Sequence, residues 1–314
     1  MIEHSAKPFV EQIVERLPDA LVSPEERAWL SGLAGTLPFV TFVLLECHLG
    51  GAERHVDISV GSDDGTNPLA RVVPAPIAAW PCLMLEYDAG RGREPAVFTR
   101  FLPAAPADAE TLLRFAEQTL GATGSAFGTL LACCAARTTD EVWITHAGAM
   151  CGRPDRPLRL NVGARRLDAL VAYARDVGFA ERDVTRLSAM LEDVRPFVDD
   201  VIFAFDVHDR VLPRFGIECY VADTAQFDAM LAFLRASRLA TFAQVDALGA
   251  WTGHDLAAHA EWPQSRRLVG DFLGTPDTIV RTLNHVKLVA TADGVRQAKA
   301  YLAARCVRPV SEPA

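Results

Sequence analysis

Residues 283–304 read LNHVKLVATADGVRQAKAYLAA, a pattern that predicts a β-hairpin near the end of the chain. Two stretches of alternating character flank Asp293-Gly294, and an Asp-Gly turn between such stretches is a strong hairpin signal. The first strand sets Val286, Leu288 and Ala290 against His285, Lys287 and Val289, and the second sets Ala298, Ala300 and Leu302 against Lys299 and Tyr301. Lys287 and Lys299 are therefore expected on one face of the hairpin.

Lysine is rare in this chain, because the 31 basic residues include only Lys7, Lys287 and Lys299. Two of these three lie in one hairpin, which suggests that an anion binds between them. The alternative is that both lysines point into water from a sheet edge, where lysine commonly guards against pairing with another chain. We favour the anion site because the same alternation recurs earlier in the sequence.

Four similar strand pairs precede the terminal hairpin. They are predicted at 39–48 with 54–60, 82–88 with 95–102, 142–147 with 158–163, and 201–207 with 215–221, the last joined by a turn at Pro213. The alternation is clearest in the last of them, where Arg214, Gly216, Glu218 and Tyr220 oppose Phe215, Ile217, Cys219 and Val221. Such alternation predicts one apolar face and one polar face for each pair.

Helical patterns separate the strand pairs. They are predicted within 8–34, at 108–121, 126–137, 167–177, 181–194, 224–236 and 242–251, and near 275–283. Ser23 and Pro24 followed by two acids predict a helix start inside the first of these ranges. Residues 61–80 are rich in Pro and Gly, and we expect them to be irregular.

The order of these elements is an imperfect internal repeat of the form α-α-β-β. It disfavours a Rossmann or TIM arrangement, in which single helices alternate with parallel strands. We expect an α+β fold in which helices cover the apolar face of ten antiparallel strands. If such a sheet closes into a barrel, its polar face becomes an interior chamber, because ten strands leave more room than side chains fill.

Composition is that of an ordinary globular protein: 314 residues, half of them hydrophobic, which we interpret as one domain spanning 1–314. The net charge of −9 argues against general nucleic-acid binding. The N-terminal residues show no continuous apolar run, so we expect no signal peptide, no membrane span and a cytoplasmic location. The oligomeric state is not readable from the sequence.

The sequence predicts no metal site built by the protein. Seven cysteines are an odd number without CxxC spacing, which argues against a disulfide framework or a zinc site. His254 and His259, with Glu261 beyond them, lack the HExxH spacing of a zinc protease. No DDxxD pair of carboxylates is present either.

The repeated α-α-β-β units, the chain length and the polar face resemble the ABBA prenyltransferases, whose ten-stranded antiparallel barrel is ringed by helices. Two C-terminal segments, RFGIECYV at 214–221 and HVKLV…AKAYL at 285–302, look most like the cyanobactin-type branch, which prenylates ribosomally made cyclic peptides. The resemblance implies that an allylic diphosphate, dimethylallyl or geranyl, ionises and that an electron-rich acceptor captures the carbocation. It also implies Mg²⁺, which the diphosphate itself would largely hold.

Such a reaction needs cations around the departing diphosphate, where negative charge builds up. The candidates are Arg100, Arg159, Arg214, Lys287 and Lys299, beside the hydroxyl groups of Tyr220 and Tyr301. By resemblance, Arg214, Tyr220 and Lys287 lie where the family's diphosphate contacts come from. The alternative for Arg159 and Arg214 is that each flanks a turn and points into solvent.

The carbocation needs shielding, and the acceptor must lose a proton. Trp143, Tyr220, Tyr301 and Phe98 would offer π-faces that stabilise a cation, although a single aromatic side chain is more often part of a core. The resemblance places a catalytic carboxylate on the first strand, where LLECHLG contains Glu46. Glu218 is the competing carboxylate on the acceptor side, or it forms an ion pair with Arg214 or a lysine.

Three functions remain open on the sequence. The first is transfer of a short isoprenoid to a side chain of a peptide, and the second is transfer to a small aromatic molecule. The third is a non-catalytic barrel that binds an anionic ligand through its lysines.

Overall fold

The computed structural model describes residues 5–51, 55–61, 67–90, 94–102, 107–121, 124–257, 262, 266, 277–291 and 296–308. The Asp293-Gly294 turn, His259 and Glu261 lie outside these ranges. The chain divides into two compact units, of which the first comprises Met1–Gly90, Thr241–Asn284 and Ala300–Ala314. The second unit comprises Arg91–Ala240 and His285–Lys299. Among the described residues, no helix is long and apolar enough to span a membrane.

Eleven described strands form one sheet in the order β11-β1-β2-β3-β4-β5-β6-β7-β8-β10-β9. They are β1 Phe42–Leu49, β2 Val56–Gly61, β3 Met84–Tyr87, β4 Ala96–Arg100, β5 Val142–Ala149, β6 Leu158–Ala164, β7 Asp200–Val207, β8 Val211–Tyr220, β9 Gly253–Leu256, β10 Thr278–Ala290 and β11 Arg296–Val307. Because β11 pairs with both β1 and β10, the sheet closes on itself. The predicted ten-stranded antiparallel barrel is therefore confirmed, and β9 is an additional strand beside β10.

The helices confirm the predicted α-α-β-β repeat. They are α1 Lys7–Val14, α2 Pro24–Ala34, η1 Pro68–Arg71, α3 Ala75–Ala78, α4 Ala109–Leu120, α5 Ser125–Ala136, α6 Leu167–Asp176, α7 Glu181–Val194, η2 Arg195–Phe197, α8 Thr224–Ala236 and α9 Phe242–Trp251. Residues 61–80 were expected to be irregular, but η1 and α3 supply a short helical pair in the second repeat. The α2 helix begins as predicted, because Ser23 and Glu26 form a reciprocal capping box.

Two further local predictions were wrong. The helix expected near 275–283 is the first part of β10, where Thr278 to Arg281 pair with β9. The β-branched residues Thr278, Ile279 and Val280 favour a strand there. Pro213 does not form a turn but lies within β8, next to a register shift between Phe205 and Val207 of β7. Such an irregularity tolerates a residue without a backbone N–H.

In the first unit, the hairpin β1–β2 separates an apolar face from a polar face. Leu45 pairs with Ile58, and both are fully buried. Glu46 pairs with Asp57 on the opposite face, and both carboxylates are also buried. An apolar cluster consists of Phe42, Leu44, Tyr301 and Ala303. Leu44 of this cluster lies two residues before Glu46 on β1.

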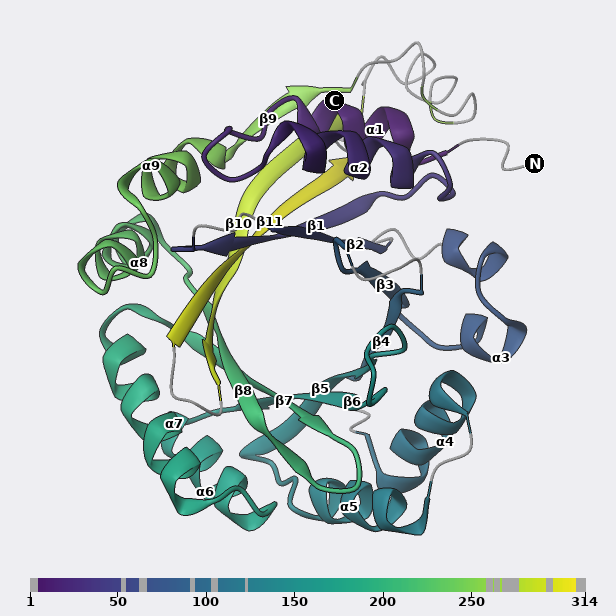
Figure 1. The fold of residues 1–314 in the computed structure, drawn as a ribbon, viewed down its shortest axis with the longest axis vertical. Coiled ribbons are helices and arrows are strands. Elements are labelled where there is room, and N and C mark those ends of the chain that lie inside the picture. The colour runs from purple at the N-terminus through teal and green to yellow at the C-terminus, as the bar shows by residue number, and fades with distance from the viewer. Residues whose placement is uncertain are drawn as a thin grey trace, which may run out of the picture. The chain divides into compact units, whose positions relative to one another are not determined.

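In the second unit, aromatic packing identifies the face that the helices cover. Phe203, Phe205 and Phe215 pack against Phe179, which precedes α7, and Phe205 also contacts Tyr173 of α6. Figure 1 shows α4, α5, α6 and α7 outside the strands β5 to β8. Strand alternation therefore directs the residues next to these phenylalanines away from the helices.

Three glycines on that other face are covered by large side chains of neighbouring strands. A Cβ at Gly148 would overlap the ring of Phe98, its partner on β4. A Cβ at Gly163 would lie 3.3 Å from Trp143 Cε2, and one at Gly216 would lie 2.9 Å from Lys287 Cε. Glycine at these positions makes room for side chains that lie across the strand.

Gly148→Ala should destabilise the protein by about 1–3 kcal/mol, because the new methyl group displaces the Phe98 ring. Gly128→Ala in α5 is the matched control, since a Cβ there would make an ordinary contact 3.8 Å from Leu113 Cδ1. That control should stabilise the protein by about 0.5–1 kcal/mol, because alanine favours a helix. Urea unfolding measures both, and equal effects would contradict the packing described.

Candidate active site

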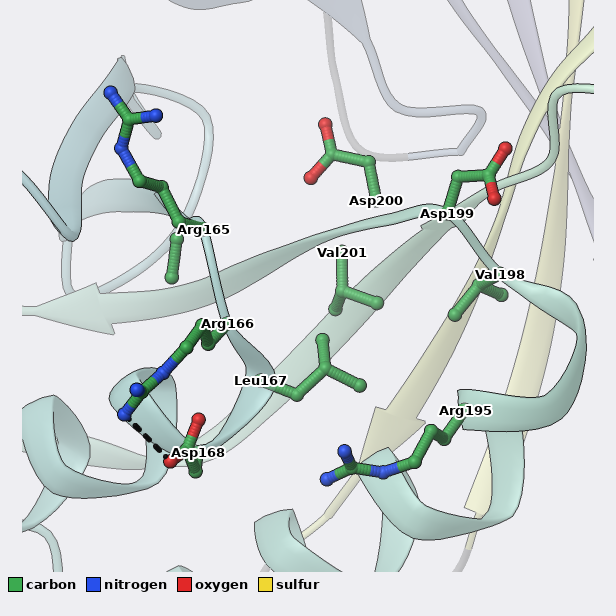
Figure 2. Close-up of a pocket in the computed structure, with 10 residues that line it drawn as sticks. Arg165, Arg166, Leu167, Asp168, Arg195, Val198, Asp199, Asp200 and Val201 are labelled. Carbon is green, nitrogen blue, oxygen red and sulfur yellow. Dashed lines mark hydrogen bonds and ion pairs between the residues drawn. The ribbon is translucent and has the colours of Figure 1, made fainter.

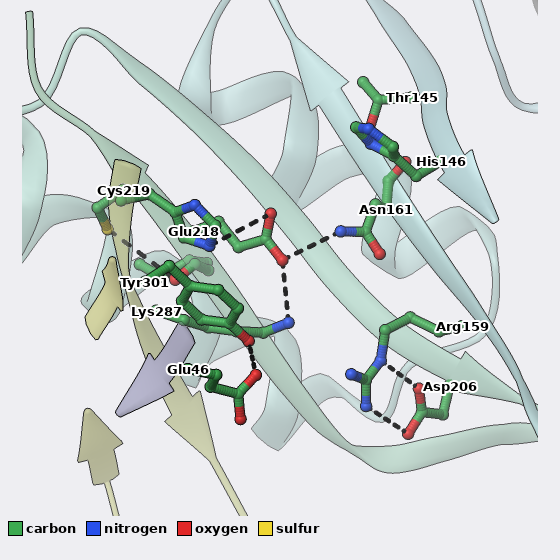
Figure 3. A network of polar contacts seen from close by, with 12 residues as sticks. Glu46, Thr145, His146, Arg159, Asn161, Asp206, Glu218, Cys219, Lys287 and Tyr301 are labelled. Carbon is green, nitrogen blue, oxygen red and sulfur yellow. Dashed lines mark hydrogen bonds and ion pairs between the residues drawn. The ribbon is translucent and has the colours of Figure 1, made fainter. Parts of the chain in front are cut away.

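The polar face of the second unit is organised around Glu218 on β8. Its Oε1 accepts hydrogen bonds from Lys287 Nζ and Asn161 Nδ2, each at 3.0 Å (Figure 3). Its Oε2 accepts one from Tyr220 Oη at 3.4 Å, and His285 Nε2 lies 4.0 Å away. Strand pairing causes this arrangement, because Lys287 lies directly opposite Glu218 in the β8–β10 register.

These contacts hold Glu218 in its charged form. Burial alone would raise the pKa of this carboxyl, but Lys287 and His285 more than offset burial and lower the pKa to about 2. Burial and the nearby Glu218 raise the pKa of Tyr220 well above its usual value, so this tyrosine remains a hydrogen-bond donor. Glu218 is thus suited to orienting charged groups and poorly suited to accepting a proton near neutral pH.

The two lysines of the terminal hairpin are buried: Lys287 is 6% exposed and Lys299 is 9% exposed. The alternative in which they point into water from a sheet edge is therefore excluded. Of the partners considered for Glu218, the structure shows a lysine, Lys287. A buried ammonium group is costly unless anions and hydrogen bonds compensate it, so these positions favour binding of negative charge.

The three arginine candidates lie in different environments. Arg159 is held by Asp206 in a bidentate pair, with Nε 2.8 Å and Nη2 3.1 Å from the carboxylate oxygens (Figure 3). Burial would raise the pKa of Asp206, but Arg159 and Arg153 overcome it and lower the pKa. Arg214 is half-buried, whereas Arg100 is exposed at the end of β4. The solvated alternative for Arg159 is therefore wrong.

The four aromatic candidates belong to strands β4, β5, β8 and β11. In the second unit, Phe98 covers Gly148, Trp143 covers Gly163, and the Tyr220 ring lies 4.9 Å from the His285 ring. In the first unit, Tyr301 packs in the apolar cluster with Leu44. None of these rings belongs to the aromatic core around Phe203.

Sequence reasoning missed two polar residues of the second unit. Asn161 is 6% exposed, and its Oδ1 has no hydrogen-bond partner among the described residues. His146 pairs with Asn161 in the register of β5 and β6. Burial lowers the pKa of His146 to about 4, and Glu218 only partly opposes this shift. The alternation in residues 158–163 places Asn161 on the polar face of the strand. The sequence pattern does not indicate that Asn161 contacts Glu218.

In the first unit, Glu46 accepts a hydrogen bond from the Tyr301 hydroxyl through Oε2 (Figure 3). Its Oε1 lies 3.3 Å from His48 Nε2, and Asp57 Oδ2 lies 3.4 Å from the same nitrogen. The sequence analysis singled out Glu46 and Tyr301 but neither His48 nor Asp57. The sequence shows that His48 and Asp57 alternate with apolar neighbours. It does not show the strand register that brings Asp57 opposite Glu46.

A separate cleft of about 560 Å³ lies in the second unit, between the end of β6, the start of β7 and the start of α6 (Figure 2). Arg165, Arg166 and Arg195 line it together with Asp168, Asp199 and Asp200. Because the three cations are balanced by three carboxylates, this cleft has no charge preference for an anionic ligand. None of the site residues predicted from the sequence lines this cleft.

Lys287→Met should destabilise the protein by about 3–5 kcal/mol, because it leaves the Glu218 carboxylate buried without its main cation. Lys287→Met with Glu218→Gln should recover most of this loss, since the amide still accepts the hydrogen bond from Asn161. Denaturant unfolding at neutral pH provides the measurement, and Lys7→Met at an exposed lysine is the control. A double variant no more stable than Lys287→Met would rule out the ion-pair explanation.

The stability of the protein should fall as the pH drops from 6.5 towards 4, because unfolded His146 binds a proton in this range while the folded form resists it. Between pH 7.5 and pH 5, the wild type should lose about 2 kcal/mol more than His146→Asn. The control is His208→Asn at an exposed turn. Identical pH profiles for wild type and His146→Asn would show that this histidine is not buried as a neutral group.

Comparisons with known proteins agree with the fold. No protein-family model and no curated protein matches the chain. Among solved structures, AnaPT from Neosartorya fischeri has a TM-score of 0.55 at 11% identity, covering 97% of this chain and 92% of its own. The 6-dimethylallyltryptophan synthase from Micromonospora olivasterospora, solved with DMASPP and Trp, has a TM-score of 0.54 at 15% identity, covering 95% and 97%.

The prenyltransferase PriB, solved with L-tryptophan and dimethylallyl thiolodiphosphate, has a TM-score of 0.53 at 13% identity, covering 97% of this chain and 98% of its own. At identities this low, the structural match shows the fold only. The chemistry must be argued from the residues of this chain. The comparison therefore shows that the chain has the ABBA prenyltransferase fold.

Proposed function

We propose that the chain transfers a short isoprenoid, dimethylallyl or geranyl, from its diphosphate to an electron-rich aromatic acceptor. The observation that carries this proposal is the burial of Lys287 and Lys299 in a closed sheet of the ABBA type. Solved proteins with this fold include complexes with dimethylallyl thiolodiphosphate. Fold alone does not determine function, so the proposal depends on what each polar face is able to do.

On the second unit, Lys287, Lys299, Arg159, Arg214 and Tyr220 are proposed to bind the diphosphate. Lys287 donates one N–H to Glu218, which holds its ammonium group in place. Donors that are already held in place stabilise the charge that develops on the leaving group most effectively. Arg100 is exposed, so we assign it a role only at the outer edge of this site.

The aromatic side chains on the same face are proposed to shield the carbocation. Phe98, Trp143 and Tyr220 offer π-faces, which attract a cation electrostatically without supplying a nucleophile. Tyr220 also donates a hydrogen bond to Glu218, which fixes its hydroxyl group in the polar network. Asn161 Oδ1 is then available to accept a hydrogen bond from bound substrate.

On the first unit, Glu46 is proposed to accept the proton that the acceptor loses. The Tyr301 hydroxyl orients this carboxylate, and the apolar cluster of Phe42, Leu44, Tyr301 and Ala303 lies on the same polar side of β1. An apolar patch beside a buried carboxylate suits an aromatic ring that carries an N–H or O–H group. Glu218 is better assigned to positioning Lys287, because its low pKa makes it a weak base.

Two acceptor classes fit this arrangement. The complexes of two solved proteins with tryptophan favour a small aromatic molecule. The likeness of 214–221 and 285–302 to cyanobactin-type enzymes keeps an aromatic side chain of a peptide as the alternative. Both acceptors present the same kind of ring, so we propose tryptophan-like and tyrosine-like groups as the first substrates to test, with and without Mg²⁺.

Incubation with dimethylallyl or geranyl diphosphate and such acceptors should yield products heavier by one prenyl group, detected by mass spectrometry. Glu46→Gln should lower turnover by about 100-fold or more while leaving donor affinity unchanged, because it removes only the proton acceptor. Lys299→Met should weaken binding of the diphosphate instead. The matched controls are Glu15→Gln and Lys7→Met, which change exposed side chains of the same types.

Absence of product with every donor and acceptor, in spite of tight diphosphate binding, would favour the non-catalytic barrel. Unchanged turnover in Glu46→Gln would show that this residue does not act as the proton acceptor. Unchanged affinity in Lys299→Met would remove this lysine from the diphosphate site.

A further inference from the structure

We propose that Glu46, His48 and Asp57 form a binding site for one divalent transition-metal ion on the polar face of the first unit. The three residues come from two paired strands: Glu46 and His48 are two residues apart on β1, and Asp57 lies opposite Glu46 on β2. One ligand atom from each residue lies within 4.8 Å of the others. The site is a property of this hairpin and does not depend on the proposed prenyl transfer.

The distances between the side-chain atoms suit a shared ion. Glu46 Oε1 and Asp57 Oδ2 lie 3.3 and 3.4 Å from the same nitrogen, His48 Nε2. Ligands bound to one ion at about 2.1 Å are separated by about 3.0 Å at right angles and about 3.4 Å at tetrahedral angles. The observed separations match this range.

Hydrogen bonds from a protonated His48, without a metal ion, explain these distances less well. One imidazole nitrogen carries one N–H, which forms a strong hydrogen bond with a single carboxylate at about 2.7–2.9 Å. Here two carboxylates approach the same nitrogen at longer and nearly equal distances. An ion that accepts a lone pair from each of the three groups explains the convergence directly.

Contacts outside the cluster orient both carboxylates. The Tyr301 hydroxyl donates to Glu46 Oε2, and the Ala89 N–H donates to Asp57 Oδ1 at 2.7 Å. Each carboxylate is therefore held by one oxygen and directs the other oxygen towards His48 Nε2. Outer hydrogen bonds of this kind fix the direction of metal ligands and tune their affinity.

Charge supports the same conclusion. Glu46 and Asp57 face each other directly in the strand pair and are each 5% exposed, so two carboxylates meet in a poorly solvated place. A divalent cation between them would be attracted to both. Imidazole with two carboxylates suits Zn²⁺, Mn²⁺, Fe²⁺ or Co²⁺ better than Mg²⁺ or Ca²⁺, which prefer oxygen ligands alone.

Three protein ligands leave coordination positions open, as in catalytic rather than structural sites. All three side chains lie on the polar face of β1 and β2, so an oxygen or nitrogen of a bound molecule can complete the coordination. An ion there would take Glu46 as a ligand and would itself ease loss of the acceptor proton, so the role proposed for Glu46 as proton acceptor applies to the metal-free site. This consequence rests on the proposed function, whereas the binding site does not.

Titration of the metal-free full-length protein with Co²⁺ in the absence of any prenyl donor tests the site. The wild type should bind one ion with visible d–d absorption, and Zn²⁺ should displace it. His48→Ala and Asp57→Asn should each weaken binding by at least about 100-fold, because even loss of an outer partner costs roughly 10- to 100-fold. His55→Ala is the matched control, since its ring lies 5.6 Å from that of His48 but outside the cluster.

Circular dichroism of each variant confirms that it is folded before it is titrated. Saturable binding by the wild type and His55→Ala, lost in both cluster variants, would support the site. No saturable binding by the wild type, or equal binding by His48→Ala and the wild type, would overturn it. Failure of prenyl transfer would leave this titration unaffected, so the two proposals fail separately.

Discussion

The buried ion pair between Lys287 and Glu218 organises the polar face of the second unit. Neither charge tolerates burial alone, and each lies opposite the other in the β8–β10 register. Glu218 also gathers Asn161, Tyr220 and His285, so one carboxylate orients side chains from three strands. Gly216 completes the arrangement, because a larger residue would meet the Lys287 side chain.

The two units carry polar faces of different character. In the second unit, lysine and arginine side chains accompany aromatic rings, which suits an anionic leaving group and a short-lived cation. In the first unit, buried carboxylates and a histidine accompany an apolar cluster, which suits an aromatic acceptor that loses a proton. The proposed function assigns the diphosphate to the face of the second unit and the proton of the acceptor to the face of the first.

Strand alternation made much of this predictable. A period of two residues assigns Glu46, Glu218, Lys287 and Lys299 to polar faces without further information. Register was not predictable, because it depends on the turns, and so the convergence of Glu46, His48 and Asp57 was missed. Thr278 to Arg281 were mistaken for a helix because their partner strand, β9, carries too short a pattern to be recognised. Pro213 was mistaken for a turn because the register shift beside it is not visible in sequence.

A crystal structure with dimethylallyl thiolodiphosphate bound tests the central claim most directly, because it locates the diphosphate relative to the buried lysines. The account predicts diphosphate oxygens within hydrogen-bond distance of Lys287 Nζ and Lys299 Nζ, with the isoprenoid chain against an aromatic side chain of the same face. A diphosphate bound instead in the cleft of Arg165, Arg166 and Arg195, or no binding at saturating analogue, would contradict it.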